Sequence, residues 1–507
     1  MSTRNARWFL LVIIIIASFL RLYHLPSLPP GLYPDEAMNG NNALEAIRTG
    51  EYKVYYPENN GREGLFMNIQ SLFLRATGLR EPWVMRLPSA LFGILTVLGI
   101  YFLGKELVSR ETGLLAAFLL ATSFWHINFS RIGFRAIMAP FFLTWTIALI
   151  LIAWRKIREP TARRGAFFIT VLGGIVYGLG FYSYIAYRVS PILIFFIIAY
   201  FFWRSAKEGW RRQFFQSAAL FLLVTFCTAL PIGIYYLQHP ANFLGRTSQV
   251  SVFSSPTPLR DLGLNIFKTL GMFNFSGDYN WRHNYPGRPE LFWPVGVLFI
   301  IGIAIGIKSL FATKYESGTN IRKVLRNTRL GFGVLFLWFI LASLPVVISN
   351  EGIPHALRSI LLIPPAILFA AIGGIFLYEK LATKYESDTN IRKLLLTTCY
   401  LLLTFLVFET YHAYFILWGE NPNVQGAFAQ NYVDVGRALN ALAPSAPKYV
   451  MVDAGGVLVR GIPMPAQTVM FITDTFLPEQ QREKNIHYVL PGDATQIPKD
   501  AYVFFIR

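Results

Sequence analysis

Residues 137–153 read Ile-Met-Ala-Pro-Phe-Phe-Leu-Thr-Trp-Thr-Ile-Ala-Leu-Ile-Leu-Ile-Ala, and this run contains no charged side chain. As a helix it approaches the length of about 20 residues that crosses the hydrocarbon core of a bilayer. Trp154-Arg155-Lys156 follows the run, and basic residues in that position are typical of the cytoplasmic end of a membrane span. The stretch therefore predicts a membrane-spanning helix that ends in the cytoplasm.

Similar apolar runs recur along the whole chain, so we expect eleven spans, within a range of ten to thirteen. The run at 113–125 is short for a crossing and needs its neighbours to complete one. A polar tail, 418–507, follows the last run. The other runs lie near 8–25, 83–104, 166–184, 190–203, 214–237, 291–311, 330–348, 359–378 and 396–417.

The composition of the 507-residue chain supports an α-helical polytopic membrane protein. Charged residues make up 15%, apolar residues 54%, and the mean hydropathy is +0.43, whereas soluble domains carry roughly 25% charged residues. These values exclude a cytosolic enzyme, a secreted disulfide scaffold and a disordered tail protein. Both cysteines, Cys227 and Cys399, fall in predicted spans, so no external disulfide framework or cysteine metal cluster is expected.

The net charge of +18 is explained by the membrane rather than by nucleic acid. With the N-terminus inside, nearly all the excess lies in short inner loops, for example in 155–164, where it would orient the spans. No nucleic-acid-binding motif is visible, so no nucleic-acid partner is expected. The first run follows Arg4 and Arg7 but has no cleavage site after it, and we interpret it as a retained anchor.

Two inner loops contain a near-copy, 312–323 against 382–393, which we interpret as a local duplication that helps orient the chain. Three outer segments, 26–82, 238–290 and 418–507, are too long to be simple connections, and we expect the function there.

The tail predicts a small α/β domain outside the membrane, so residues 1–417 form the membrane domain and 418–507 an extracytoplasmic domain. It opens with a plausible helix at about 427–442, and Gly and Pro then separate apolar runs at 449–452, 468–472 and 502–506. No catalytic cluster is visible in it.

The first outer segment begins with an acidic pair, Asp35 and Glu36, directly after Pro34. Proline at the first helical position followed by acids is also what any helix start favours, so a structural role is an equal alternative. In the functional interpretation, a carboxylate outside the membrane acts as general base on an acceptor hydroxyl. Adjacent helical residues diverge by about 100°, so both cannot address one atom. We therefore assign Asp35 as the base and Glu36 as a supporting or structural group.

Two further clusters suit the same chemistry. Glu63 follows a Gly-marked polar turn where an apolar stretch resumes, and it is a third catalytic candidate, with a solvated loop as the alternative. Arg131 and Arg135 are four residues apart, would share a helix face, and could hold a phosphate. Their alternative role is interfacial anchoring.

Aromatic, amide and basic residues gather at 277–287 and again at 354–358. Aromatic faces and amides suit sugars, and Arg or His suits phosphate, whereas a belt of interfacial aromatics is the competing account. The candidates for sugar or acceptor binding are Asp278, Asn280, Arg282, His283 and Tyr187, and those for donor phosphate include His355 and Arg358.

These residues carry a resemblance to the GT-C class of membrane glycosyltransferases, in the branch of dolichyl-phosphate-mannose protein mannosyltransferases and aminoarabinose transferases (glycosyltransferase family 39-like). It covers about the first 417 residues. The motifs are Pro34-Asp35-Glu36-Ala37, Asn60-Gly61-Arg62-Glu63, Arg131 to Arg135, Gly180 to Arg188, Gly277 to Gly287 and Pro354 to Arg358.

The resemblance implies transfer of a sugar, mannose-like or another hexose, from a polyprenyl-phosphate donor to an acceptor hydroxyl at the outer face, with inversion. It gives Asp35 the role of base, and Arg131 or Arg135 with His355 and Arg358 the donor phosphate. The acceptor is a glycan, a lipid or a protein. The chain lacks the His-x-His pair and the inserted recognition module of the eukaryotic protein mannosyltransferases, which disfavours protein and favours a bacterial or archaeal plasma membrane.

Other interpretations remain open from the sequence. A divalent ion, Mg²⁺ or Mn²⁺, fits the oxygen ligands of Asp35, Glu36 and Glu63, although their spacing does not require one. A transporter or lipid flippase would also have about eleven spans, but we would then expect charges within the spans or paired broken helices. In this sequence most ionisable groups lie in loops or at the ends of spans, and no inverted repeat is visible. A catalytically inactive relative of the enzyme would have the same sequence pattern.

Overall fold

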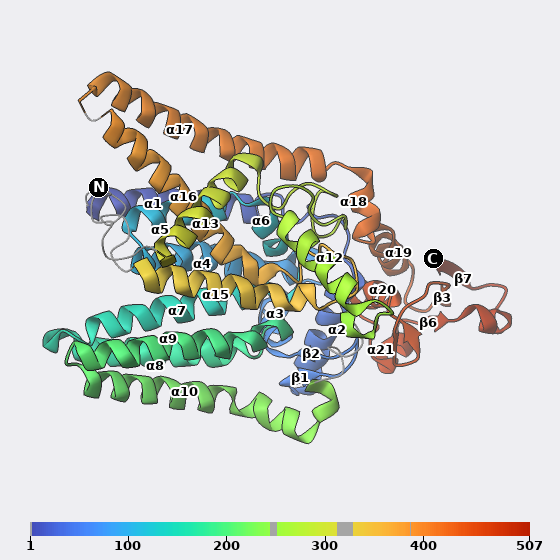
Figure 1. Cartoon of the computed structure of the whole chain (residues 1–507). Helices are drawn as coiled ribbons and strands as arrows, with labels where there is room; N and C mark the ends of the chain where they lie inside the picture. Colours follow the sequence, from blue (N-terminus) through green and yellow to red (C-terminus); the bar gives the residue numbers. More distant parts are fainter. Residues whose placement is uncertain (1–2, 244–250, 312–327, 386) are drawn as a thin grey trace.

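Long helices lie side by side in the computed structural model of the chain, which describes residues 3–243, 251–311, 328–385 and 387–507 (Figure 1). Within these residues ten helices are long and apolar enough to cross a membrane. They are α1 (Thr3–Leu22), α4 (Pro82–Leu107), α7 (Met138–Lys156), α8 (Arg163–Gly180), α9 (Ser190–Lys207), α10 (Arg211–Gln238), α13 (Trp293–Phe311), α15 (Thr328–Val347), α16 (Ile363–Lys384) and α17 (Thr389–Tyr411).

An eleventh candidate span is bent. It consists of α5 (Arg110–Ala121) and α6 (Phe124–Ser130), which meet at an angle of 63°. The helix breaks because the hydroxyl oxygen of Ser123 accepts the backbone N–H of His126 and so starts a new helix there. Ten helices, or eleven with the bent pair, lie within the expected range of ten to thirteen spans, and the run that was short for a crossing is the bent one.

Small residues let some spans approach closely, as between α13 and α16. A Cβ atom on Gly302 would lie 1.8 Å from the carbonyl oxygen of Phe369, and one on Gly373 would lie 2.0 Å from that of Leu298. Only glycine fits at such contacts, a common device in membrane helix packing. Cys227 in α10 and Cys399 in α17 lie within spans as predicted, and both are free thiols.

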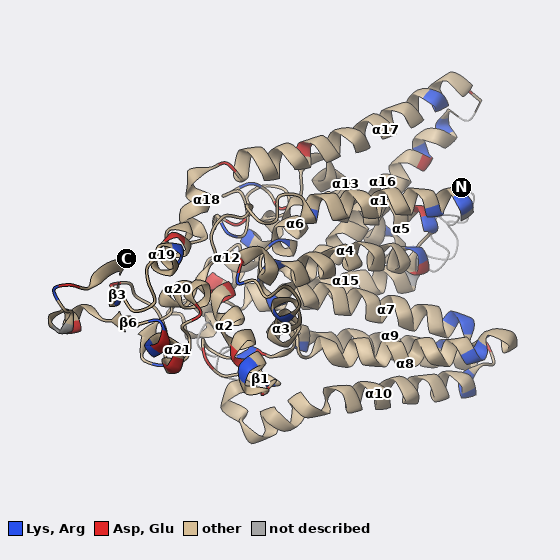
Figure 2. Ribbon diagram, turned by 180° about the vertical axis from the view of Figure 1, so that it is seen from behind, with Lys and Arg blue, Asp and Glu red and all other residues tan. Residues whose placement is uncertain are grey.

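The two ends of the bundle differ in charge and in content. Lys and Arg gather at the end where the N-terminus lies, including the ends of α7, α8 and α10 (Figure 2). The opposite end carries α2 (Pro34–Thr49), α3 (Leu65–Thr77), the hairpin β1 (Tyr55–Tyr56) and β2 (Arg62–Glu63), α12 (Pro258–Gly271) and the C-terminal segment. The long predicted outer segments therefore share one end of the molecule.

Several short helices connect these elements. They are the 3-10 turns η1 (Arg135–Ile137), η2 (Pro160–Ala162), η3 (Ile185–Val189), η4 (Val252–Ser254) and η5 (Ile360–Leu362), and the π-helical turn η6 (His412–Trp418) that ends α17. The first copy of the duplicated motif, 312–323, lies outside the described residues. The second copy runs from the end of α16 into α17, where the side chain of Asp388 caps the helix.

The C-terminal segment forms a small α/β unit, as predicted. Its parallel sheet has the order β6-β3-β7, with Lys448 opposite both Ile486 and Tyr502. The apolar run 468–472 is part of a helix, α20, and not of the sheet. The elements are α18 (Pro422–Ala427), α19 (Gln430–Ala441), β3 (Lys448–Val452), β4 (Leu458–Val459), β5 (Ile462–Pro463), α20 (Ala466–Thr473), α21 (Pro478–Glu483), β6 (Ile486–Val489), η7 (Pro491–Gln496) and β7 (Tyr502–Ile506).

This unit packs directly on α2, which places it beside the first outer segment. Phe471 of α20 is fully buried against Gly40, where an added Cβ would lie 2.5 Å from its ring. Met38 of α2 belongs to the same apolar cluster as Val450 and Ile506 of the sheet. The C-terminal segment therefore holds α2 from behind and fixes the direction in which its first turn points.

Candidate active site

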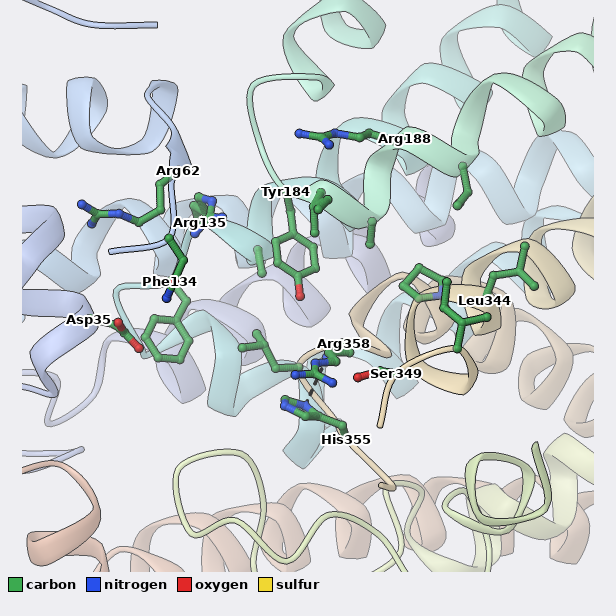
Figure 3. A pocket seen from close by; sticks show the side chains of 18 of the residues that line it. Asp35, Arg62, Phe134, Arg135, Tyr184, Arg188, Leu344, Ser349, His355 and Arg358 are labelled. Carbon is green, nitrogen blue, oxygen red and sulfur yellow. Dashed lines mark hydrogen bonds between the residues drawn. The ribbon is translucent and has the colours of Figure 1, made fainter. Parts of the chain in front are cut away.

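A cavity of about 500 Å³ lies between the first turn of α2, the loop before α3, η1, η3 and the end of α15 (Figure 3). Toward Asp35 the lining is mostly polar and charged, with Phe134 among these residues, and toward Leu344 it is mostly apolar. The polar lining residues are Asp35, Asn39, Asn59, Asn60, Arg62, Arg135, Tyr184, Arg188, Ser349, His355 and Arg358, and the apolar ones are Phe134, Ala136, Ile185, Ala186, Val189, Leu344, Pro345, Ile348 and Leu357.

The start of α2 presents Asp35 to this cavity. Pro34 occupies the first turn, as the sequence predicts, and the carboxylate of Asp35 accepts a hydrogen bond of 2.5 Å from the amide of Asn59. Asn59, Asn60 and Gly61 have φ angles of 52°, 62° and 78°, a left-handed run that only such residues adopt readily. This turn places Asn59 over the carboxylate.

Glu36, the next residue, points the other way, as the helical period requires. It is fully buried, and its oxygens accept Nε and Nη2 of Arg86 at 2.9 and 3.2 Å and the N–H of Gly133 at 2.9 Å. Arg86 also donates to the carbonyls of Pro29 and Gly31. Glu36 therefore holds the loop before α2 to the bundle, the structural option in its prediction, and it does not line the cavity.

Arg62 is a buried cation on the cavity wall. Its guanidinium donates to the side-chain oxygens of Asn39 and Asn42 at 2.6 and 2.5 Å, and its Nε–H has no hydrogen-bond partner among the described residues. Burial and the neighbouring charge of Arg135 lower the pKa of Arg62 to about 10, so it remains a cation at neutral pH. Because its hydrogen-bond partners are neutral amides, its charge is available to an anion.

Glu63 is tied to two arginines. Its Oε2 lies 3.0 Å from Nε of Arg135, and its Oε1 lies 3.3 Å from Nη2 of Arg188. Burial raises the pKa of Glu63, but the two guanidinium groups outweigh it, so the pKa lies below its ordinary value. A carboxylate of this kind is a poor proton acceptor, and Glu63 positions the arginines instead of acting as a base.

Arg131 and Arg135 do not share a helix face, and that prediction is wrong. The helix α6 ends at Ser130, and a separate turn, η1, begins at Arg135. Arg131 is fully buried, donates to the carbonyls of Leu20 and Leu28, and lies over the ring of Phe415 at 5.0 Å. Arg135 lines the cavity, whereas Arg131 braces the core.

His355 and Arg358 both reach the cavity, as predicted, but only Arg358 brings a charge there. Burial, together with His283 and Arg358, lowers the pKa of His355 to about 3, so the ring is neutral at physiological pH. Its Nδ1 accepts the backbone N–H of Arg358 at 3.4 Å, which leaves Nε2 as a donor. The side chain of Arg358 pairs with Glu351, which is 65% exposed, a weak and exchangeable partner.

The candidates Asp278 and His283 lie behind the cavity wall. Asp278 accepts His283 Nδ1 and the N–H of Ala356, both at 2.9 Å, and the N–H of Asn280 at 2.8 Å. These bonds hold the turn that carries His355, whose Nδ1 lies 3.9 Å from the same carboxylate. Neither Asp278 nor His283 lines the cavity, so they position the turn and do not themselves meet a ligand there.

Three further residues that were predicted to bind the sugar or the acceptor do not line the cavity. The side-chain oxygen of Asn280 accepts the backbone N–H of Arg282, and Arg282 lies 3.7 Å above the ring of Tyr33. Tyr187 is fully buried and donates to the carbonyl of Tyr177. Tyr184, which directly precedes η3, lines the cavity instead of Tyr187.

Sequence reasoning gave no role to Asn59, Arg62, Tyr184 or Arg188, although all four line the cavity. Arg62 and Arg188 stand inside motifs that carry the resemblance, at the mouths of outer loops. Basic residues in these loops could therefore have been proposed as cavity residues from the sequence. Their partners could not, because Arg188 pairs with Glu63, which is 125 residues away in the chain.

The carboxylates proposed for a divalent ion do not gather around one point. Asp35 faces the cavity, Glu36 is engaged with Arg86, and Glu63 is engaged with two arginines. Among the described residues, the group with metal-ligand geometry is Asp278, His283 and His355. The oxygens of Asp278 already accept three hydrogen bonds, so the structure accounts for this group without an ion.

Part of the chain matches a known protein family. Residues 65–232 match the sequence profile of the family described as dolichyl-phosphate-mannose-protein mannosyltransferase. The matched range includes Arg135, Tyr184 and Arg188 of the cavity and excludes Asp35 and His355. No curated protein sequence matches the chain.

Two solved structures share the fold over nearly the whole chain. The archaeal oligosaccharyltransferase of Archaeoglobus fulgidus superposes with a TM-score of 0.54 at 14% identity, over 97% of this chain and 65% of its own. ArnT from Cupriavidus metallidurans, solved with bound undecaprenyl phosphate, gives a TM-score of 0.52 at 14% identity, over 99% of this chain and 90% of its own. The present chain thus spans about two thirds of the archaeal protein's length.

Proposed function

We propose that this chain is a glycosyltransferase of the GT-C class and that it transfers a sugar from a polyprenyl-phosphate donor to an acceptor hydroxyl. The match of residues 65–232 to the protein mannosyltransferase family and the fold shared with ArnT support the proposal. The observation that carries the proposal is the division of the cavity into a charged and an apolar side. In Figure 3, Asp35 and Leu344 lie on opposite sides of it, with Tyr184 between them. A sugar joined through phosphate to a long hydrocarbon chain has the same division.

The donor phosphate fits the arginine cluster. Arg62 has only neutral hydrogen-bond partners, and Arg135 and Arg188 share the single carboxylate of Glu63. The cluster therefore has excess positive charge in a partly buried site, where guanidinium groups bind phosphate strongly. Positive charge there also stabilises the phosphate as it leaves the sugar.

The lipid chain fits the apolar wall. Leu344, Pro345 and Ile348 from the end of α15 and Val189 from η3 line that side of the cavity. Both elements belong to or adjoin membrane spans, so a polyprenyl chain can pass from the bilayer to the wall without crossing water. ArnT of Cupriavidus metallidurans, which has the same fold, was solved with undecaprenyl phosphate, which supports this class of donor.

Asp35 acts as the general base. The acceptor hydroxyl gives its proton to the carboxylate while its oxygen forms a bond to the anomeric carbon. The bond from that carbon to the phosphate oxygen breaks, and its electron pair leaves with the lipid phosphate. Asn59 holds one carboxylate oxygen, and attack opposite the leaving group inverts the anomeric centre. A mannose-like hexose is the proposed sugar, and a glycan, lipid or protein hydroxyl is the acceptor.

The proposed topology has the N-terminus in the cytoplasm and the cavity outside a plasma membrane. The basic residues at the N-terminal end of the bundle support it, because such residues are retained on the cytoplasmic side (Figure 2). In the same arrangement, residues 418–507 form an extracytoplasmic domain on top of the membrane domain, 1–417. Their packing against α2, which carries Asp35, agrees with that division.

The test is transfer from radiolabelled polyprenyl-phosphate sugars by purified protein in liposomes, with a membrane extract as acceptor. Asp35→Asn keeps the size of the side chain and removes its basicity, so we expect transfer to fall about 10²- to 10⁴-fold, with donor binding retained. Asp434→Asn is the matched control, because Asp434 is exposed on α19 and does not line the cavity.

Equal transfer by Asp35→Asn and wild type would return Asp35 to the role of a helix-start residue. If the wild type transfers sugar from no donor but moves the donor lipid across the bilayer, the protein is a flippase and the proposal fails.

A further inference from the structure

Helix α12 (Pro258–Gly271) is an amphipathic element at the same end of the molecule as the cavity. With 14 residues it is shorter than the length of about 20 that crosses a bilayer. It runs obliquely across that end of the bundle, beside the end of α15 (Figure 1). Its sequence combines apolar residues with Arg260, Asp261 and Lys268, so it is neither a span nor a wholly polar surface helix.

Its apolar residues face outward. Leu259, Phe267, Leu270 and Ile266 are 81%, 77%, 55% and 43% exposed. At 100° per residue these four positions fall on one stripe, with Arg260 at its edge. The opposite face, with Asn265 and Thr269, is buried against the protein. A helix whose outer face is in water would instead expose its polar residues and bury its apolar ones.

Exposed aromatic residues precede and follow α12 in the sequence. Phe253, Phe275, Tyr279 and Trp293 are 63%, 80%, 67% and 69% exposed. Trp293 is the first residue of the span α13, so at least this aromatic residue lies where a span meets its outer loop. Exposed aromatic residues are typical of the boundary between hydrocarbon and headgroups, and Arg260 at the edge of the stripe suits a lipid phosphate.

The buried face of α12 holds the wall of the cavity. The side-chain amide of Asn265 donates to the carbonyls of Val347 and Ser349 at 3.1 and 2.7 Å. Just before α12, the N–H of Val252 donates to the carbonyl of Ile348 at 2.8 Å. These carbonyls follow the last turn of α15 and have no helical donor, so α12 and its leading turn supply the partners.

We propose that α12 is an interfacial helix whose apolar stripe inserts into the outer leaflet of the bilayer, and that through Asn265 it holds the α15 wall of the cavity at a fixed depth. The partner of this surface is the lipid leaflet itself. Ile348 and Ser349 both line the cavity, and the carbonyl of Ser349 accepts a hydrogen bond from Asn265 of α12. The depth of α12 in the leaflet therefore sets the position of this part of the wall. The inference concerns placement and stands independently of the transfer reaction.

The first test measures where α12 lies, with nitroxide labels in lipid nanodiscs. Cys227→Ser and Cys399→Ser remove the native thiols, and Phe267→Cys then labels the stripe, with Lys268→Cys as the matched exposed control. We expect the ratio of collisions with oxygen to collisions with a water-soluble nickel chelate to be severalfold higher at 267 than at 268.

Two outcomes would overturn the placement. If the nickel chelate reaches both labels equally, α12 lies in water. If the label at 267 is immobile and shielded from both relaxants, a second copy or another protein covers the stripe.

The second test measures the brace, by hydrogen exchange of the amides in 344–352. Asn265→Ala removes two hydrogen bonds, and we expect exchange there to become about tenfold faster. Thr269→Val is the matched control, because Thr269 is buried on the same face and its hydroxyl has no partner among the described residues. Unchanged exchange in Asn265→Ala would show that α15 keeps its end without α12.

Discussion

On each of two faces of α2, an acid of the helix lies near a buried arginine from another element, yet the two faces are built differently. Behind the helix, Glu36 and Arg86 bond to each other, and the remaining guanidinium hydrogens reach backbone carbonyls. In front, Asp35 accepts from an amide and Arg62 donates to two amides, so neither meets an opposite charge in its hydrogen bonds. The rear face is a closed ion pair, and the front face is open to a charged ligand.

The difference shows that burial of charge does not by itself mark a functional site. Arg86, Arg131 and Arg62 are all almost inaccessible to water. Arg62 differs from the other two because it lines a cavity that can admit an anion, whereas Arg86 pairs with Glu36 and Arg131 donates to backbone carbonyls in the core. The guanidinium of Arg62 can therefore bind an anionic ligand, whereas that of Arg86 stabilises the fold through Glu36.

The strongest way to test the comparison is to break the rear pair. Arg86→Met leaves Glu36 buried without a counter-charge, which we expect to destabilise the fold by about 3–5 kcal/mol. Thermal melting in detergent measures the loss. Adding Glu36→Leu to Arg86→Met should restore much of the stability, because the unpaired charge is then gone. A melting temperature unchanged in Arg86→Met would contradict the assignment of this face to structure.

The front face should respond in binding rather than in folding. Arg62→Gln removes the uncompensated charge, and we expect donor affinity to fall about 10- to 100-fold, since a hydrogen bond to a charged group contributes roughly 1.5–3 kcal/mol. Titration with a polyprenyl phosphate measures it. Arg437→Gln, at an exposed arginine outside the cavity, serves as the control. If Arg62→Gln lowers the melting temperature and leaves affinity intact, Arg62 belongs with Arg86.

Glu63 forms ion pairs with two arginines of the cavity. Its lowered pKa predicts that the stability of the fold depends on pH. Its folded pKa is depressed, so its ion pairs stabilise the protein above the ordinary glutamate pKa and are lost as the pH falls through the lowered value. Glu63→Gln should therefore cost about 1–3 kcal/mol at pH 7, and the difference from wild type should shrink below about pH 4. Melting curves across this range measure it, and a constant difference would contradict the depressed pKa.

The smallest expected effect separates two tyrosines of one turn. Tyr184→Phe removes a hydroxyl from the cavity wall and should weaken transfer about two- to tenfold, the range of one neutral hydrogen bond. Tyr187→Phe removes a hydroxyl that lies in the core beside Tyr177, so transfer should change little while the melting temperature falls. The two variants assayed together decide it, and the reverse result would place Tyr187 at the ligand.

Local sequence patterns predict most of the fold and the opposite orientations of Asp35 and Glu36. The apolar runs predict the spans because a helix in lipid must satisfy its own backbone, so composition and length suffice. The divergence of Asp35 and Glu36 follows from the helical period alone. By the same logic, the helix at 427–442 and two of the three apolar runs of the tail appear in the structure as α19, β3 and β7.

Tertiary structure alone decided which charges meet. Arg131 and Arg135 look equivalent in the sequence, but a helix that ends at Ser130 sends one to the core and the other to Glu63. His355 looks like a phosphate ligand, but burial beside His283 and Arg358 keeps it neutral. The physical reason is that helix formation depends on neighbours three or four residues away, whereas the compensation of a charge depends on groups brought together from distant parts of the chain.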